Sequence, residues 1–65
     1  GVDSTLINYI GSTGIAKTVL RPSGKIEINA TTLDAVSLNG KYIEEGTSIK
    51  VEKFENNQLY VIKIS

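Results

Sequence analysis

The stretch Thr18–Ile28, TVLRPSGKIEI, places a proline, a serine and a glycine between two segments rich in β-branched and aliphatic residues. Pro22 fixes its own φ angle and Gly24 can adopt a positive φ, which together favour a turn. Arg21 and Lys25 flank this turn, so the same residues could also form a basic loop that holds a phosphate. The residues that follow decide between the two interpretations, because a phosphate loop leads into a helix.

The segment after the turn alternates between apolar and polar side chains. We expect one set to point into a core and the other toward solvent, namely Ile26, Ile28 and Ala30 against Lys25, Glu27 and Asn29. A period of two residues is typical of a half-buried β-strand and not of a helix. The RPSG turn therefore joins two strands, and the phosphate interpretation lacks its helix.

Four further strands are predicted from β-branched residues, alternation and the spacing of turn residues. They lie at about Gly14–Leu20, Leu33–Ser37, Ser48–Phe54 and Gln58–Ile64. The segment at residues 33–37 is the least regular of these. It could instead form one helical turn that is capped by Thr31 or Thr32.

Residues that favour turns separate the strands. Asn39-Gly40 and Gly46 suit left-handed backbone, and ENNQ at residues 55–58 suits a tight hairpin because asparagine tolerates positive φ. In the strand before that hairpin, Ile49 and Val51 are expected to face inward. Five short strands at intervals of about eight to twelve residues, without a long helix, predict an all-β fold that is a small barrel or sandwich.

The composition narrows the possible classes of function. The chain has 65 residues, with seven basic and seven acidic side chains and neither cysteine nor histidine. One small domain of this kind cannot use disulfides or a typical zinc site, so its stability must come from buried Ile, Val and Leu. Zero formal net charge argues against nucleic-acid binding, because phosphate contacts supply most of that affinity. No apolar run approaches the roughly 20 residues that span a bilayer.

Few residues are candidates for catalysis when histidine and cysteine are absent. Ser23 and Lys25 share one face of a strand, but a lysine beside a surface turn is not buried deeply enough to act as a base. Glu44 and Glu45 are adjacent, and in extended backbone they point opposite ways, so they cannot share a proton. We therefore predict no catalytic residue, no metal ligand and no cofactor-binding residue, and hence no enzyme.

Three further motifs have ordinary structural explanations. GSTG at residues 11–14 resembles part of a phosphate loop, but the helix that such a loop needs is missing. Proteins that bind single-stranded nucleic acid gather aromatic side chains in a basic groove, whereas this chain distributes its aromatics over separate segments: Tyr9, Tyr42, Phe54 and Tyr60. Residues 40–59 are similar to half of a biotinyl or lipoyl domain. However, Asn56-Asn57 occupies the hairpin tip where the modified lysine belongs, and the nearest lysine is Lys53.

Taken together, GSTGIAKTVLRPSGKIEI and LDAVSLNGKYIEEGTSIKVEKFENNQLYV resemble the C-terminal soluble domain of the NfeD family (nodulation formation efficiency proteins). The resemblance covers about residues 11–65. The matching positions in the first half are Gly11, Gly14, Ala16, Leu20, Pro22, Ser23, Gly24, Lys25 and Ile28. Those in the second half are Asp34, Ala35, Val36, Ser37, Gly40, Tyr42, Ile43, Gly46 and Val51. The chain departs from the family at Ala30-Thr31, where a glycine turn is expected.

The resemblance implies a five-stranded OB-like barrel at the end of a membrane protein. Residues 11–65 would form the barrel, and residues 1–10 would be a linker from an upstream membrane region. Within the linker, GVDST would be a tether, and LINYI would pack on the barrel or on a segment outside this chain. Family members pair with stomatin-, prohibitin- or flotillin-like membrane proteins, and long members carry a ClpP-like serine protease, no part of which lies in this chain. We therefore expect a membrane-associated bacterial or archaeal domain on the cytoplasmic face.

The last strand indicates how such a domain binds. If Leu59 and Val61 face inward, Tyr60 and Ile62 must face outward, because only one face of each barrel strand is inside. Further apolar side chains expected on the outer surface are Ile15 and Val19. Exposed apolar patches often mark protein contacts. The sequence thus predicts a non-catalytic interaction module that binds a partner or a second copy of itself. The alternative is an OB-type module that binds single-stranded nucleic acid.

Overall fold

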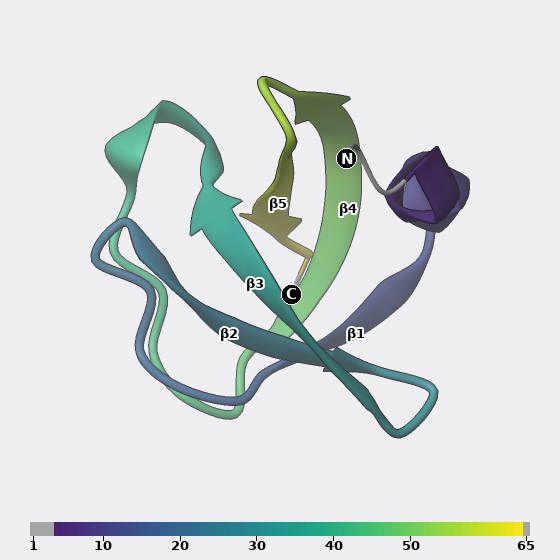
Figure 1. The fold of residues 1–65 in the computed structure, drawn as a ribbon. Helices are drawn as coiled ribbons and strands as arrows, with labels where there is room; N and C mark the ends of the chain where they lie inside the picture. Colours follow the sequence, from purple (N-terminus) through teal and green to yellow (C-terminus); the bar gives the residue numbers. More distant parts are fainter. Residues whose placement is uncertain (1–3, 65) are drawn as a thin grey trace.

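Five β-strands close into a barrel in the computed structural model, which describes residues 4–64 (Figure 1). The strands are β1 (Thr13–Ala16), β2 (Ser23–Ile28), β3 (Thr31–Ser37), β4 (Ser48–Glu55) and β5 (Gln58–Lys63). Their order is β1-β2-β3-β5-β4, and β4 pairs with β1 to close the barrel. All neighbours are antiparallel except β3 and β5, which run parallel. The expected five-stranded OB-like barrel is confirmed.

Two tight hairpins, β2–β3 and β4–β5, supply the local strand pairing. Both turns have positive φ at their two central residues, 51° and 67° at Asn29 and Ala30, and 52° and 62° at Asn56 and Asn57. Turns of this kind match the twist of the strands that they join. The ENNQ hairpin forms as predicted, but the expectation that Ala30 points into the core is wrong. Ala30 is exposed because β2 ends at Ile28 and the turn follows at once.

The remaining strand boundaries differ from the predictions mainly in the first three strands. Residues 31–37 form strand β3, so the alternative of a helical turn there is wrong. β1 ends at Ala16 and does not continue to Leu20, which instead forms an isolated bridge with Ile43. RPSG does turn the chain, but Gly24 lies inside β2 without a positive φ. A Cβ on Gly24 would lie 2.5 Å from the carbonyl oxygen of Val19, so close approach of the backbone requires the glycine.

A β-bulge in β4 lies between Val51 and Lys53. Before the bulge Val51 is opposite Val61, and after it Phe54 is opposite Leu59. A bulge inserts one residue and shifts the alternation of faces. Strict alternation from Val51 would turn Lys53 inward and Phe54 outward. The bulge instead lets Phe54 pack against the core and leaves Lys53 partly exposed on the outside.

The core of the described residues consists of ten buried apolar side chains: Ala16, Leu20, Ile26, Ile28, Ala35, Ile43, Ile49, Val51, Leu59 and Val61. The inward positions predicted in the second and fourth strands, Ile26, Ile28, Ile49 and Val51, are confirmed. Each large aliphatic side chain buried here contributes about 1.5–3 kcal/mol. Ser37 is buried among them. Its hydroxyl donates to the carbonyl oxygen of Lys41, so this polar group does not oppose folding.

A short 3-10 helix, η1 (Ser4–Tyr9), precedes β1 and lies beside β4 (Figure 1). Leu6 and Tyr9 pack against the core, which is one of the two positions expected for LINYI. Ile7 and Ile10 are exposed. The expected GVDST tether begins with residues 1–3, which lie outside the described residues. The N-terminal segment is therefore in contact with the barrel from Leu6 onward.

A second 3-10 helix, η2 (Leu38–Gly40), follows β3 at the predicted turn. Asn39 and Gly40 have φ angles of 64° and 69°, and Gly46 has a φ of 87° before β4, so these turn residues have the left-handed backbone that was expected. Within residues 4–64, neither 3-10 helix has the length and apolar character needed to cross a bilayer. η2 and the loop after it pack beside β5, where they shape the site described next.

Candidate functional site

The outer face of β1, β4 and β5 carries apolar side chains on adjacent strands. Strand register places Ile15 opposite Ser48, and the N–H of Ile64 donates to the carbonyl of Ser48 at 3.1 Å from the other side. In the next row, Ile62 lies opposite Lys50. Ile15 is 43% exposed and Ile64 is 44% exposed. We refer to Ile15, Ile62 and Ile64, with the small Ser48 between them, as the outer strip.

The directions predicted for the last strand are confirmed. Leu59 and Val61, expected to face inward, are buried, whereas Tyr60 and Ile62 are half-buried on the outside. Val19, a further outward residue in the sequence prediction, is half-buried in the loop beyond β1. The outer strip therefore depends on β5 and β1 together, and β4 separates them.

A groove lies between the η2 segment and β5 and borders the outer strip at Ile62. Its volume is about 340 Å³, and its lining consists of Leu38, Asn39, Lys41, Tyr42, Ile43, Val61, Ile62 and Lys63. The Tyr42 side chain is largely open to solvent, with 60% of the residue exposed. We refer to this feature as the η2–β5 groove. A concave site with an apolar floor and a few polar groups is the form that binding sites usually take.

The charged residues that line the η2–β5 groove are both lysines. Lys41 and Lys63 line it, and Lys50 lies opposite Ile62 on β4. Two ion pairs occur within residues 4–64, one of them between Lys25 and Asp34 at 2.5 Å and the other between Lys53 and Glu55 at 3.0 Å. None of the three lysines at the groove belongs to either pair. Within the described residues, these three lysines therefore present positive charge that no ion pair satisfies.

A larger depression of about 650 Å³ lies over β2, β3 and the start of β5. Its apolar residues include Leu6, Leu33 and Leu59, and its charged residues are Lys25 and Asp34. Because these two charges form an ion pair with each other, the depression offers a partner little electrostatic specificity. The η2–β5 groove is therefore the better candidate for specific recognition.

The residues weighed for catalysis do not form a catalytic arrangement. Ser23 and Lys25 are both exposed on β2, and Lys25 pairs with Asp34 in solvent. Glu44 and Glu45 are exposed in the loop before β4. Within residues 4–64, no three acidic side chains lie close enough together to hold a metal ion. The chemistry of these positions is that of a solvated surface.

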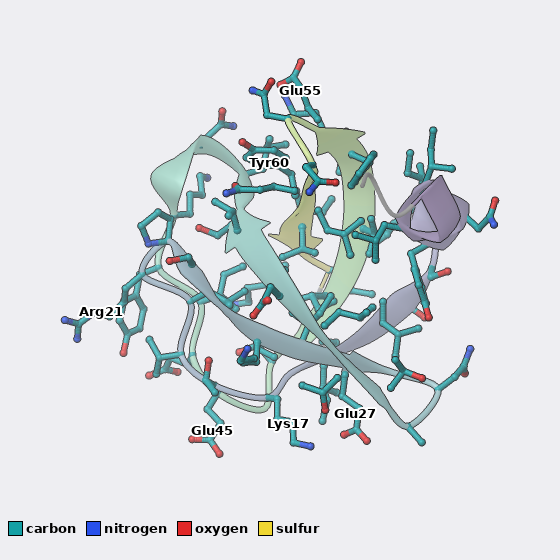
Figure 2. The ribbon with its side chains drawn as sticks, in the orientation of Figure 1. Lys17, Arg21, Glu27, Glu45, Glu55 and Tyr60 are labelled. Carbon is teal, nitrogen blue, oxygen red and sulfur yellow. The ribbon has the colours of Figure 1, made fainter. Side chains whose placement is uncertain are left out.

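The residues weighed for phosphate binding lie in turns that lead into strands. GSTG ends in β1, where a Cβ on Gly14 would lie 2.1 Å from the carbonyl oxygen of Glu27, so this glycine serves strand packing. The RPSGK segment enters β2. Lys17 and Arg21 point away from the barrel, as do the acidic residues Glu27 and Glu45 (Figure 2). Mixed charges of this kind do not form the basic groove that single-stranded nucleic acid requires.

The aromatic side chains have separate roles. Tyr9 and Phe54 pack against the core, so neither is free to stack on a base. Tyr60 lies under the ammonium group of Lys53, which is 5.0 Å from the ring centroid. Lys53 also pairs with Glu55. Both residues lie in β4 and not at the hairpin tip, where a carrier domain would place its modified lysine. Tyr42 remains the most exposed of the four aromatics in the described surface.

The sequence did not reveal that Lys41, Tyr42 and Lys63 lie together. About twenty residues separate Lys63 from the other two, and the groove exists only because η2 packs beside β5. The turn at Asn39-Gly40 was recognised, but a turn signal does not tell which strand the turn will contact. Only the exposed apolar character of β5 pointed toward this side of the barrel.

Comparison with known proteins adds independent information. The family model described as the NfeD-like C-terminal, partner-binding domain matches residues 8–63. The chain is 37% identical over 62 residues to membrane protein NfeD1b of Bacillus subtilis (strain 168), and the match covers 95% of the chain and 14% of that relative. The C-terminal domain of stomatin operon partner protein 1510-C from Pyrococcus horikoshii has a similar structure, with a TM-score of 0.79 and 29% identity. That match covers 89% of this chain and 91% of the other.

Proposed function

Because this chain belongs to the family of NfeD-like C-terminal, partner-binding domains, we propose that it is the accessory domain of an NfeD-like membrane protein and binds a stomatin-type membrane protein. Flotillin- and prohibitin-type proteins are the related partners to consider. The family is one of partner-binding domains and not of enzymes, which agrees with the solvated surroundings of Ser23, Lys25, Glu44 and Glu45. The relatives' names, a membrane protein and a stomatin operon partner protein, support both the membrane context and the class of partner.

The observation that carries this proposal is the outer strip. Ile15 on β1 and Ile64, which directly follows β5, are exposed on either side of Ser48, and Ile62 adjoins them in the next row. Neighbouring strands lie about 4.8 Å apart, so the two isoleucines are roughly 10 Å apart across the serine, and one partner surface could contact both. Contact with a partner would remove this surface from water, which is the main source of affinity in protein association.

Binding of the 65-residue chain to the soluble domain of the stomatin-type protein from the same organism tests the proposal by titration calorimetry. We expect Ile62→Lys to weaken binding at least ten-fold, because it places a charge within the buried area. Ile7→Lys is the matched control, since Ile7 is 53% exposed on η1 and outside the outer strip. Absence of binding by the unaltered chain, or equal loss in both variants, would refute the proposal. A circular dichroism spectrum of each variant shows whether the barrel still folds.

We further propose that residues 1–10 connect the barrel to a membrane region of the parent protein and that the barrel lies on the cytoplasmic face. The chain has no cysteine, so Glu45→Cys introduces a unique thiol on its exposed surface. Labelling of the Glu45→Cys parent protein in intact cells with a membrane-impermeant maleimide should not exceed that of the unaltered parent protein, and it should exceed it after lysis. Excess labelling of the Glu45→Cys variant in intact cells would place the barrel on the outer face.

A further inference from the structure

The η2–β5 groove combines apolar residues with positive charge. This combination indicates the chemistry of the partner segment, which membership of the family does not. The groove is lined by the apolar residues Leu38, Tyr42 and Ile62 together with two lysines, Lys41 and Lys63. Lys50 adds a third positive charge opposite Ile62. Neither ion pair within residues 4–64 involves any of these three lysines. The groove is therefore apolar in its centre, and the lysines at its edge take part in neither ion pair of the described residues.

We propose that the η2–β5 groove receives an apolar side chain that acidic side chains flank, on a segment of a protein partner. The inference rests on the proposed function, because it describes how the partner-binding domain recognises that partner. A volume of about 340 Å³ suits one or two inserted side chains. Apolar anchors that enter a pocket supply most of the affinity of an interface, and complementary charges at its edge supply orientation and specificity. Glutamate or aspartate beside the anchor would pair with Lys41 and Lys63.

Other anionic ligands fit the groove less well. A lipid surface offers no side chain that would fill a concave site, although its headgroups would attract the lysines. A nucleic acid would pair with the lysines but would leave Leu38 and Ile62 exposed. The formal net charge of zero also provides no long-range attraction for a polyanion. The combination of apolar centre and basic edge favours a protein segment.

Two matched peptides and the stomatin-type protein test this inference on the isotope-labelled 65-residue chain. One synthetic peptide carries a leucine pair between glutamates, and its copy carries lysines in place of the glutamates. We expect the acidic peptide to shift the amide signals of residues 38–43 and 61–63, and the basic copy to leave them unchanged. Lys41→Glu and Lys63→Glu should each weaken binding of the acidic peptide and of the stomatin-type protein by about 2- to 10-fold. Raising the salt concentration should reduce the difference in affinity between the unaltered chain and the two glutamate variants.

Lys17→Glu is the control, because it makes the same charge change on an exposed lysine in the β1–β2 loop. Equal binding of the two peptides, or an equal effect of Lys17→Glu, would overturn the inference. If the stomatin-type protein binds the Lys41→Glu and Lys63→Glu variants as well as the unaltered chain, the proposed function survives and the groove is not the recognition site. If the unaltered chain does not bind that protein, the proposed function fails.

Binding to phosphatidylglycerol vesicles without a response to either peptide would identify a lipid site instead, and dimerisation that Tyr42→Ser abolishes would identify a second copy as the occupant.

Discussion

Replacing Ala30 with glycine should stabilise the barrel. Ala30 is the second residue of the β2–β3 turn and has a φ of 67°. An L-residue with a Cβ loses about 1–2 kcal/mol in this left-handed conformation, whereas glycine has no such cost. Ala30 is exposed, so removal of its methyl group costs no core packing. The preceding residue, Asn29, has a φ of 51° but belongs to a residue type that tolerates this region.

Glycine also increases the conformational entropy of the unfolded chain, which opposes the gain by about 0.4–1 kcal/mol. The expected net increase in the free energy of unfolding is therefore about 0.5–1 kcal/mol. In a domain of this size, such an increase raises the midpoint of thermal unfolding by about 2–8 °C. Urea unfolding followed by circular dichroism measures the free energy, and a thermal scan measures the midpoint.

Ala35→Gly is the matched control, because Ala35 is 2% exposed within β3 and does not have a positive φ. The same chemical change there removes a buried methyl group and loosens a strand, so it should destabilise the barrel by about 1–2 kcal/mol. Opposite signs at the two alanines would support the assignment of strain to the turn. If Ala30→Gly lowers the free energy of unfolding as Ala35→Gly does, the reasoning about the left-handed turn is refuted.

Three other substitutions test the packing of the barrel. Gly24→Ala should destabilise it by about 1–3 kcal/mol, because the new Cβ would meet the carbonyl oxygen of Val19 at 2.5 Å; an unchanged urea midpoint would show that the backbone moves aside. Leu59→Ala should cost about 2–5 kcal/mol, since Leu59 is 1% exposed and its truncation leaves a cavity in the core; a loss below about 1 kcal/mol in urea unfolding would mean that the site collapses freely. Glu55→Ala should change stability by less than about 1 kcal/mol, because its ion pair with Lys53 is exposed; a larger change that persists in high salt would contradict that view.

Alternation along the chain was sufficient to predict part of the barrel interior. Ile26, Ile28, Ile49 and Val51 are buried as their period of two residues indicates, because only one face of each strand can be inside. The pattern could not show where alternation stops. In β4 the bulge brings Phe54 inward, and a bulge leaves no distinctive mark in the sequence KVEKFE.

Glycine and asparagine signals were more reliable for the existence of turns than for their geometry. Gly46 and the Asn56-Asn57 pair have the positive φ angles that were expected. Gly24 was assigned to the same class, but it is required by the approach of Val19 from the adjacent loop, which is a tertiary contact. At Ala30 the chain uses alanine where the turn favours glycine, so the composition of the segment concealed the position of the turn.

The candidate site was only partly accessible from the sequence. The outward direction of Ile62 follows from alternation alone, and so does the inward direction of Leu59 and Val61. The groove requires knowledge of how η2 packs on β5, and no local pattern encodes that contact. Lysines such as Lys41 and Lys63 also look like ordinary solvated residues until they are found around one apolar opening.

β1 forms the shortest strand pairing of the closed barrel. It has four residues and pairs with β2 at only Ile15 and Ala16, while its pairing with β4 spans Thr13–Ile15. Ala16 is the one fully buried side chain of β1, so the amide protons of this strand should exchange with solvent sooner than those of the β2–β3 hairpin. A barrel that opens here could accept the same strand from a neighbouring molecule. That exchange would form a domain-swapped dimer with no interface other than the one already present in the monomer.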